Sequence, residues 1–235
     1  MSLLATPEFW IALVQIIMIN IVLSGDNAVV IALACRALPP AQQKKAIMFG
    51  SVGAIVLRIV LTFFAVMLLG LPYLKLVGAA LLLWIGVGLL KGDDDEDELQ
   101  GHSNLVAAIK TIIVADLVMS LDNVIGVAAA AKGSLPLLII GLVISIPLII
   151  YGSTLILKLM GRFPVIITIG AGLLGWVAGE MALSDPAIAG WAAERHTLHM
   201  LAPAMGALLV VATGKWLVIR SQATVEAPAL DRAPS

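Results

Sequence analysis

Carboxyl and amide side chains stand inside long apolar runs of this sequence, where they are expensive unless they bind something. Two runs carry them, LSGDNAVVIA and MSLDNVIGVAA with the residues just before each. An Asp at the centre of a membrane helix costs about 2.5–3.5 kcal/mol, so such groups persist where they face a polar interior. The candidates for a functional site are Asn20, Asp26, Asn27, Asp116, Asp122 and Asn123.

Oxygen is the only ligand atom that these candidates offer. Two carboxylates would neutralise a divalent cation, and amides, a hydroxyl and freed backbone carbonyls would add neutral oxygens. Such surroundings suit Mg²⁺, Ca²⁺ or Mn²⁺, whereas the lack of nearby Cys or His disfavours zinc and copper. The alternative is a structural clamp of interhelical hydrogen bonds, but these contribute only about 0.6–2 kcal/mol in model systems. We therefore predict a metal site.

The spacing of the polar residues in the first run constrains how they can share one ion. Asn20, Ser24 and Asn27 are spaced to share one helix face, whereas Asp26 lies about 100° around from Asn27 on an ideal helix. Both members of the Asp-Asn pair reach one ion only if the helix unwinds or several helices meet there. Gly25 makes local unwinding plausible.

The second run repeats this pattern with one difference. Asp116, Ser120 and Asn123 share a face, and Asp122 again lies beside it, but Leu121 stands where the first run has glycine. The two runs therefore need not be equally distorted.

The two runs belong to an internal repeat. The segments beginning at Ile16 and Ile112 align without a gap at an offset of 96 residues, and the offset is 92 further along the chain. Three helices, three related helices and one extra helix follow from this pattern. Because each copy has an odd number of spans, the copies must insert in opposite directions, which is a signature of transporters that bind substrate where the copies meet. The later matches are Pro72 with Pro164, Gly78 with Gly170, and Trp84 with Trp176.

Arg58 is a charged residue in the middle of the second predicted span, with no counterpart in the second copy. It could be the counter-ion of an empty carboxylate site, or its side chain could extend to an interface. The sequence leaves both alternatives open.

The composition identifies the environment of these helices. Of 235 residues, 61% are hydrophobic and 12% are charged, and the mean hydropathy is +1.08. Soluble chains carry about 25% charged residues, so this is predicted to be an all-α, polytopic membrane bundle. A net charge of -1 leaves no basic field for nucleic acid. About seven transmembrane helices are expected, at roughly 9–34, 46–70, 72–90, 105–131, 135–158, 163–183 and 199–219.

The distribution of Lys and Arg predicts the orientation. Eight of them lie on one side of the predicted bundle and three on the other, which favours an outside N-terminus and a cytoplasmic C-terminus. The acidic run 93–98 then falls in an inner loop, as a solvated linker or as a metal-collecting antechamber. Residues 221–235 are predicted to be a disordered cytoplasmic tail. The inner set is Arg36, Lys44, Lys45, Lys91, Lys158, Arg162, Lys215 and Arg220.

With both Asp-Asn motifs in repeat register, the chain resembles the TerC family of integral membrane proteins, in its compact seven-span type called YjbE-like. The resemblance implies a bacterial cell-membrane protein related to the LysE superfamily of exporters. It associates the chain with manganese export, with tellurium resistance and, for some members, with loading metal onto exported enzymes. The motifs match at Asp26, Asn27, Asp122 and Asn123, with Asp116 as a further candidate.

One transporter domain is therefore predicted over 8–220, with repeats at about 8–91 and 104–184 and an extra helix at about 199–219. Our first hypothesis is a secondary exporter of Mn²⁺, with proton exchange as its driving force and no permanently bound cofactor. The sequence contains no GxxxxGK[ST] motif for nucleotide. The bilayer and a divalent cation are the expected partners, and homo-oligomers or other membrane proteins remain open.

Two other classes compete with the exporter. Asp26 and Asp122 could form the aspartyl dyad of an intramembrane enzyme, but such enzymes need a protonated pair and no metal. We expect no enzymatic activity. The second alternative is an accessory membrane protein that assists the insertion or metallation of exported proteins, or a tellurium-resistance protein without transport of its own.

Overall fold

Helices account for all the regular structure in residues 7–23, 25–91, 101–131 and 134–226, which are the residues that the computed structural model describes. This confirms the predicted all-helical membrane bundle. The elements are α1 (Pro7–Leu23), α2 (Gly25–Cys35), α3 (Pro40–Leu69), α4 (Leu74–Lys91), α5 (Gly101–Ala131), α6 (Leu135–Arg162), α7 (Val165–Leu183), α8 (Ala189–Ala193) and α9 (His196–Glu226).

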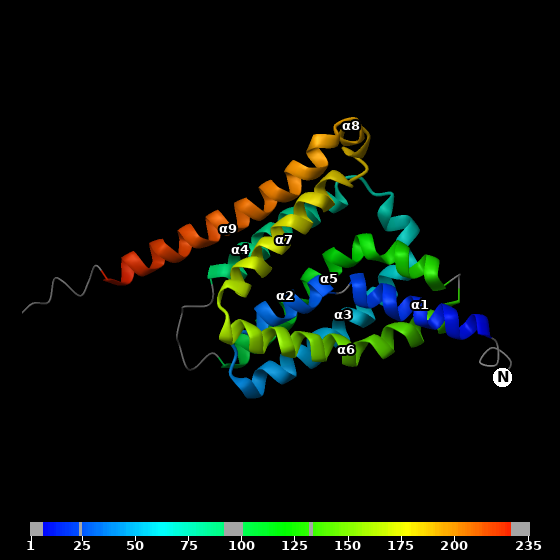
Figure 1. Cartoon of the computed structure of the whole chain (residues 1–235), viewed down its shortest axis with the longest axis horizontal. Coiled ribbons are helices and arrows are strands. Elements are labelled where there is room, and N and C mark those ends of the chain that lie inside the picture. The colour runs from blue at the N-terminus through cyan, green and yellow to red at the C-terminus, as the bar shows by residue number, and fades with distance from the viewer. Residues whose placement is uncertain (1–6, 24, 92–100, 132–133, 227–235) are drawn as a thin grey trace, which may run out of the picture.

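Six of the described helices are long and apolar enough to cross a membrane, namely α3, α4, α5, α6, α7 and α9. The pair α1 and α2 makes a seventh crossing if it is counted as one bent span. The start of α1 and the end of α9 lie at opposite ends of the bundle, as an odd number of crossings requires (Figure 1).

The first predicted span, 9–34, is not one continuous helix. α1 ends at Leu23, α2 begins at Gly25, and the two axes are bent by 49°. The corresponding part of the second copy lies within α5, which runs unbroken through Leu121. The difference follows the residues, because glycine has no side chain to hold the backbone in a helix and leucine is a strong helix former.

The C-terminal boundary needs a correction. α9 continues to Glu226, so residues 221–226 are helical and do not belong to the predicted disordered tail. Gln, Ala and Glu in this segment have high helix propensity, which lets the last turns extend beyond the apolar run. The remaining tail, 227–235, and the acidic run 93–98 lie outside the described residues.

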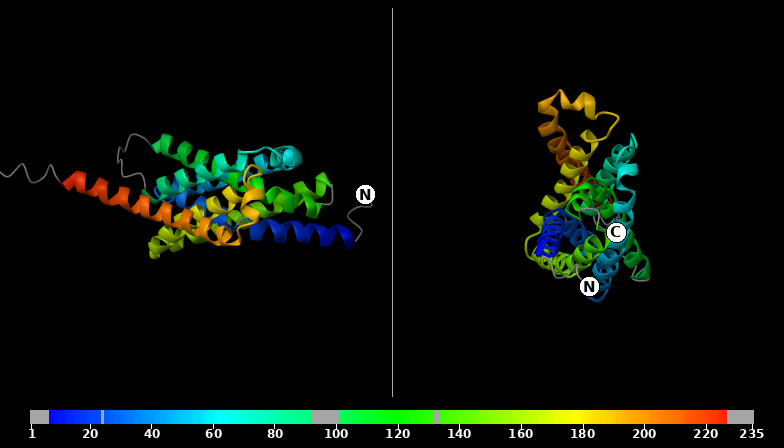
Figure 2. Two further views of the ribbon diagram at one scale, coloured as in Figure 1. Left: turned by 90° about the horizontal axis from the view of Figure 1, so that it is seen from above. Right: turned by 90° about the vertical axis from the view of Figure 1, so that its right-hand side faces the viewer.

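Two groups of helices make up the bundle (Figures 1 and 2). One consists of α1, α2, α3, α5 and α6, and the other of α4, α7 and α9. Within the first group, α3 packs along α5 while α6 packs along α1 and α2. The second span of each copy therefore rests mainly on the first span of the other copy. The two copies interlock, and the structural groups cut across the sequence repeat.

Small residues bring α7 and α9 into close contact. A Cβ atom added at Gly175 would overlap the backbone of Gly206, and one added at Gly179 would overlap the backbone of Ala202. Gly175 and Gly179 form a GxxxG pair, the pattern that lets membrane helices approach closely. The extra helix α9 is thus attached to the second copy by direct backbone packing.

Asp185, in the turn after α7, holds the start of α4. Its carboxylate accepts hydrogen bonds from the backbone N–H groups of Tyr73, Lys75 and Leu76, at 2.9, 3.0 and 3.2 Å, and from Ala187 at 2.8 Å. Burial raises the pKa of this carboxyl, but the four N–H donors outweigh it and hold the pKa below its usual value. Sequence reasoning missed Asp185, whose role depends on a partner more than 100 residues away.

Candidate metal-ion site

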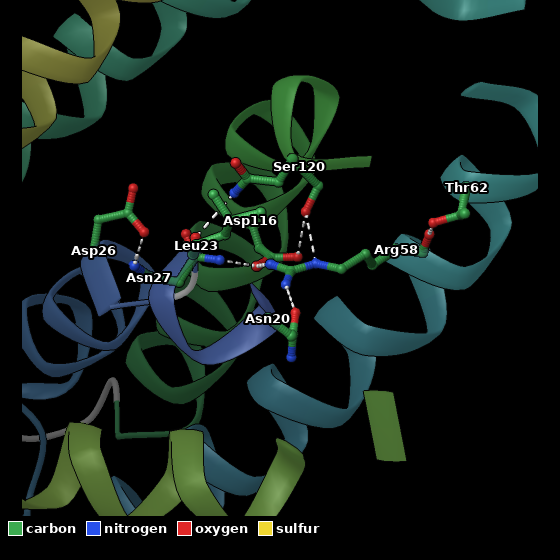
Figure 3. A network of polar contacts seen from close by, with 9 residues as sticks. Asn20, Leu23, Asp26, Asn27, Arg58, Thr62, Asp116 and Ser120 are labelled. Carbon is green, nitrogen blue, oxygen red and sulfur yellow. Dashed lines mark hydrogen bonds and ion pairs between the residues drawn. The ribbon is translucent and has the colours of Figure 1, made fainter. Parts of the chain in front are cut away.

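Arg58 of α3 lies at the centre of a buried polar network in the first group of helices (Figure 3). Only 1% of its surface is exposed. Its Nη1 donates to Asn20 Oδ1 at 2.5 Å, its Nε to Ser120 Oγ at 3.0 Å, and its Nη2 to Asp116 Oδ1 at 2.5 Å. The contact with Asp116 is an ion pair. Of the two alternatives left open by the sequence, the structure thus shows Arg58 as the counter-ion of a buried carboxylate.

Asp116 gathers the rest of the network around one carboxylate. Its Oδ1 also accepts from Asn27 Nδ2 at 2.6 Å, and its Oδ2 accepts from Ser120 Oγ at 3.1 Å. The bond from Ser120 joins residues four apart on α5, as their predicted common face requires. Asn27 is 3% exposed, and its Oδ1 meets no hydrogen-bond donor in the described part of the chain. A buried acceptor without a donor is costly, and it is the kind of oxygen that a cation could use.

The break between α1 and α2 adjoins this network. A helix end leaves backbone carbonyls without their usual partners. Asn123 of α5 donates through its Nδ2 to the carbonyl oxygen of Leu23, the last residue of α1, at 3.0 Å. An amide of the second copy therefore satisfies the broken helix of the first, and Asn20 and Asn27 approach the Arg58 and Asp116 side chains from two different helices.

The pairing of Asp26 with Asp122 stays a prediction, because the structure describes only the Asp26 side chain. Asp26 lies in the first turn of α2, is only partly buried, and accepts a 2.8 Å hydrogen bond from the backbone N–H of Asn27. In Figure 3 it stands apart from the Arg58 guanidinium, with Asn27 between them. Asp122 belongs to α5, but its side chain lies outside the described part of the structure. Within that part, no three His, Cys, Asp or Glu side chains gather as metal ligands.

The oxygens of the network form a site for a cation, and the Arg58 guanidinium occupies that site. Oxygens from Asn20 on α1 and from Asp116 and Ser120 on α5 converge on the guanidinium. Sequence reasoning included Asn20 and Asp116 but not Ser120, although the spacing of Ser120 from Asp116 was the signal that could have added it. Arg58 was noticed as an unmatched charge, but its partner is set by the packing of α3 along α5.

Comparison with known proteins agrees with this architecture. The family model described as "Integral membrane protein TerC family" matches residues 5–223. The chain belongs to the TerC family. It is a multi-pass membrane protein, and no solved structure matches it.

Several TerC relatives are similar over most of this chain. The uncharacterized membrane protein YjbE of Bacillus subtilis is 42% identical over 87% of this chain and 94% of its own length. The uncharacterized membrane protein YceF of the same organism is 26% identical over 77% of this chain and 74% of its own length. The inner membrane protein YoaE of Escherichia coli is 26% identical over 72% of this chain but only 36% of its own length. The chain thus matches YjbE over most of the length of both proteins, but it spans only about a third of YoaE.

Proposed function

We propose that this TerC protein is a secondary transporter that exports divalent cations, with Mn²⁺ as its substrate, from the cytoplasm across a bacterial inner membrane. The N-terminus then lies outside and the C-terminus inside, and the protein has no enzymatic activity. The proposal rests on one observation: side-chain oxygens from two spans of different repeat copies surround a buried positive charge beside a broken helix. Asp26 and Asp122 would complete the ligand set once substrate enters.

Arg58 sets the condition for binding. A divalent cation 4 Å from a guanidinium is repelled by about 8 kcal/mol at an effective dielectric constant of about 20. This is comparable to the whole binding free energy of a micromolar ligand. The Asp116 carboxylate could offset this repulsion only if it were free to bind the ion, but the guanidinium occupies its Oδ1. We infer that substrate binding requires Arg58 to leave Asp116. The ion pair belongs to the empty carrier, whose carboxylate it neutralises.

The packing of the helices argues against a rocking motion of one sequence repeat against the other. Rocking of one sequence repeat against the other would break the contacts of α3 with α5 and of α6 with α1 and α2. A movement of the group α4, α7 and α9 against α1, α2, α3, α5 and α6 breaks fewer contacts. Gly78 and Gly170 lie at the boundary between the groups, where each third helix packs closely against the first span of the other copy. We propose that alternating access uses this boundary.

Transport is tested with purified protein in liposomes that contain a fluorescent Mn²⁺ indicator. We expect Mn²⁺ flux with the wild type and at least a tenfold loss in Asp116→Asn, Asp26→Asn and Asp122→Asn. Glu180→Gln is the matched control, because Glu180 is a carboxylate of α7 that is bonded to exposed Trp176 and lies outside the network. Arg58→Gln should bind Mn²⁺ more tightly than the wild type but transport it more slowly, since its empty site stays charged.

Cellular metal content gives an independent test under manganese challenge. Overexpression of the wild type should lower cellular manganese selectively, and the Asp116→Asn and Asp26→Asn variants should not. Flux in the three Asp variants equal to that of the wild type would refute the site. If the wild type moves no cation in liposomes while other membrane proteins co-purify with it, the accessory function replaces the transporter.

A further inference from the structure

A second site lies at the end of the bundle where α2, α4 and α6 finish and α3 begins. The structure has a cavity of about 660 Å³ there. Its walls come from the turn after α2 and from α3, α4, α6 and α7, so both copies of the repeat contribute. No residue of the Arg58 network lines it.

Positive charge dominates this cavity. Arg36, Lys44, Lys91 and Lys158 line it, each from a different segment, and none of the described lining residues is acidic. The whole chain has a net charge of -1, so this concentration of cations is local. Gln43 and Thr154 add polar side chains to the wall.

Such a cavity is unsuited to a divalent cation. Four like charges around one space repel Mn²⁺, so the cavity is not an entrance for the proposed substrate. The same charges attract an anion with several acceptor oxygens, and a phosphate group is the commonest such anion in a cell. All four cations lie at helix ends on one side of the bundle, which is the level of the phospholipid headgroups.

We propose that this cavity binds a phosphate group, either of an anionic phospholipid or of a free phosphate-bearing anion. The volume is large enough for a headgroup with its phosphate and glycerol, and the cavity lies at the end of the bundle where α2, α4 and α6 finish and α3 begins. Bound there, the anion would link α3, α4 and α6 across the boundary between the two helix groups, so that its occupancy stabilises their relative position. The proposal does not depend on the transported cation.

The test compares two pairs of lysine substitutions that remove the same charge. Lys44→Gln with Lys158→Gln removes two exposed cations that line the cavity, whereas Lys45→Gln with Lys215→Gln removes two exposed cations that do not line it. Each protein is purified in neutral detergent and titrated with phosphatidylglycerol or phosphatidylcholine by native mass spectrometry. A second arm titrates inorganic phosphate and follows thermal unfolding by tryptophan fluorescence.

A juxtamembrane cation contributes about 1 kcal/mol of attraction to anionic lipid, which is about fivefold in affinity. We expect phosphatidylglycerol to bind in preference to phosphatidylcholine and the cavity pair to bind it about 25-fold more weakly, while the Lys45 and Lys215 pair changes little. Binding of inorganic phosphate with the same dependence, but without lipid selectivity, would assign the site to a soluble anion. An equal loss of binding in both lysine pairs would overturn the proposal. It would also be overturned if phosphatidylglycerol were not preferred to phosphatidylcholine and inorganic phosphate did not bind.

Discussion

The ion pair between Arg58 and Asp116 should behave as one energetic unit. Both side chains are buried, with exposures of 1% for the guanidinium side chain and 9% for the carboxylate side chain. Removing one partner leaves an uncompensated charge inside the bundle, which typically costs about 3–5 kcal/mol. We therefore expect Arg58→Met and Asp116→Asn each to lower the free energy of unfolding by about 3–5 kcal/mol.

The double variant Arg58→Met/Asp116→Asn should be much more stable than the sum of the single variants implies. It removes both charges together, and replacing a buried ion pair with neutral groups is often close to neutral. We expect it to lie within about 2 kcal/mol of the wild type. The coupling free energy would then be at least about 4 kcal/mol, above the roughly 0.5–3 kcal/mol that is usual for residues in contact.

Unfolding in mixed micelles, titrated with a denaturing detergent and followed by tryptophan fluorescence, measures all four proteins. Lys110→Met is the control, because it removes an exposed cation from α5 and should change the stability by less than about 0.5 kcal/mol. Single-variant costs that add within about 0.5 kcal/mol in the double variant would show that the two residues act independently. That result would also remove the argument that Arg58 neutralises the empty site.

Three further predictions concern the scaffold, and the same unfolding assay checks their stability effects. Gly179→Ala should destabilise the protein by about 2 kcal/mol or more, because the added methyl group meets the backbone of α9. In Gly88→Ala the methyl group meets open space, so this control should be neutral or stabilising. Equal effects of the two substitutions would contradict the close packing of α7 and α9. Asp185→Asn should lower stability by about 1–2 kcal/mol at pH 7. The folded pKa of Asp185 lies below its unfolded value of 3.8. The carboxylate therefore contributes its full stabilisation above pH 3.8 and loses it as the pH falls through the folded pKa. The difference in stability between the variant and the wild type should shrink in acid. Asn123→Ala should lower the free energy of unfolding by about 1–3 kcal/mol, because it leaves the Leu23 carbonyl without its donor. The same substitution should slow Mn²⁺ flux in liposomes. An unchanged stability would show that water replaces the amide.

Much of this architecture follows from local sequence. Apolar runs of about 20 residues must become spanning helices, because only a helix satisfies the backbone within hydrocarbon. The same rule makes polar residues inside those runs conspicuous, so the Asp-Asn motifs, Asp116 and Asn20 could be selected without a structure. The contrast between Gly25 and Leu121 left room for unequal distortion of the two copies, and the structure has a break in the first copy at this point.

Tertiary packing decided what local patterns could not encode. Hydrophobic periodicity shows which residues of a helix face inward but not which helix they meet, so the interlocking of the two copies was hidden. Arg58 illustrates the consequence: its sequence position gave a charge at mid-membrane, but its three partners lie 38 to 62 residues away on other helices. The basic cavity and the role of Asp185 likewise depend on segments that meet only in the folded chain. Sequence determined the helices and the polar groups they carry, and packing determined which of those groups share a site.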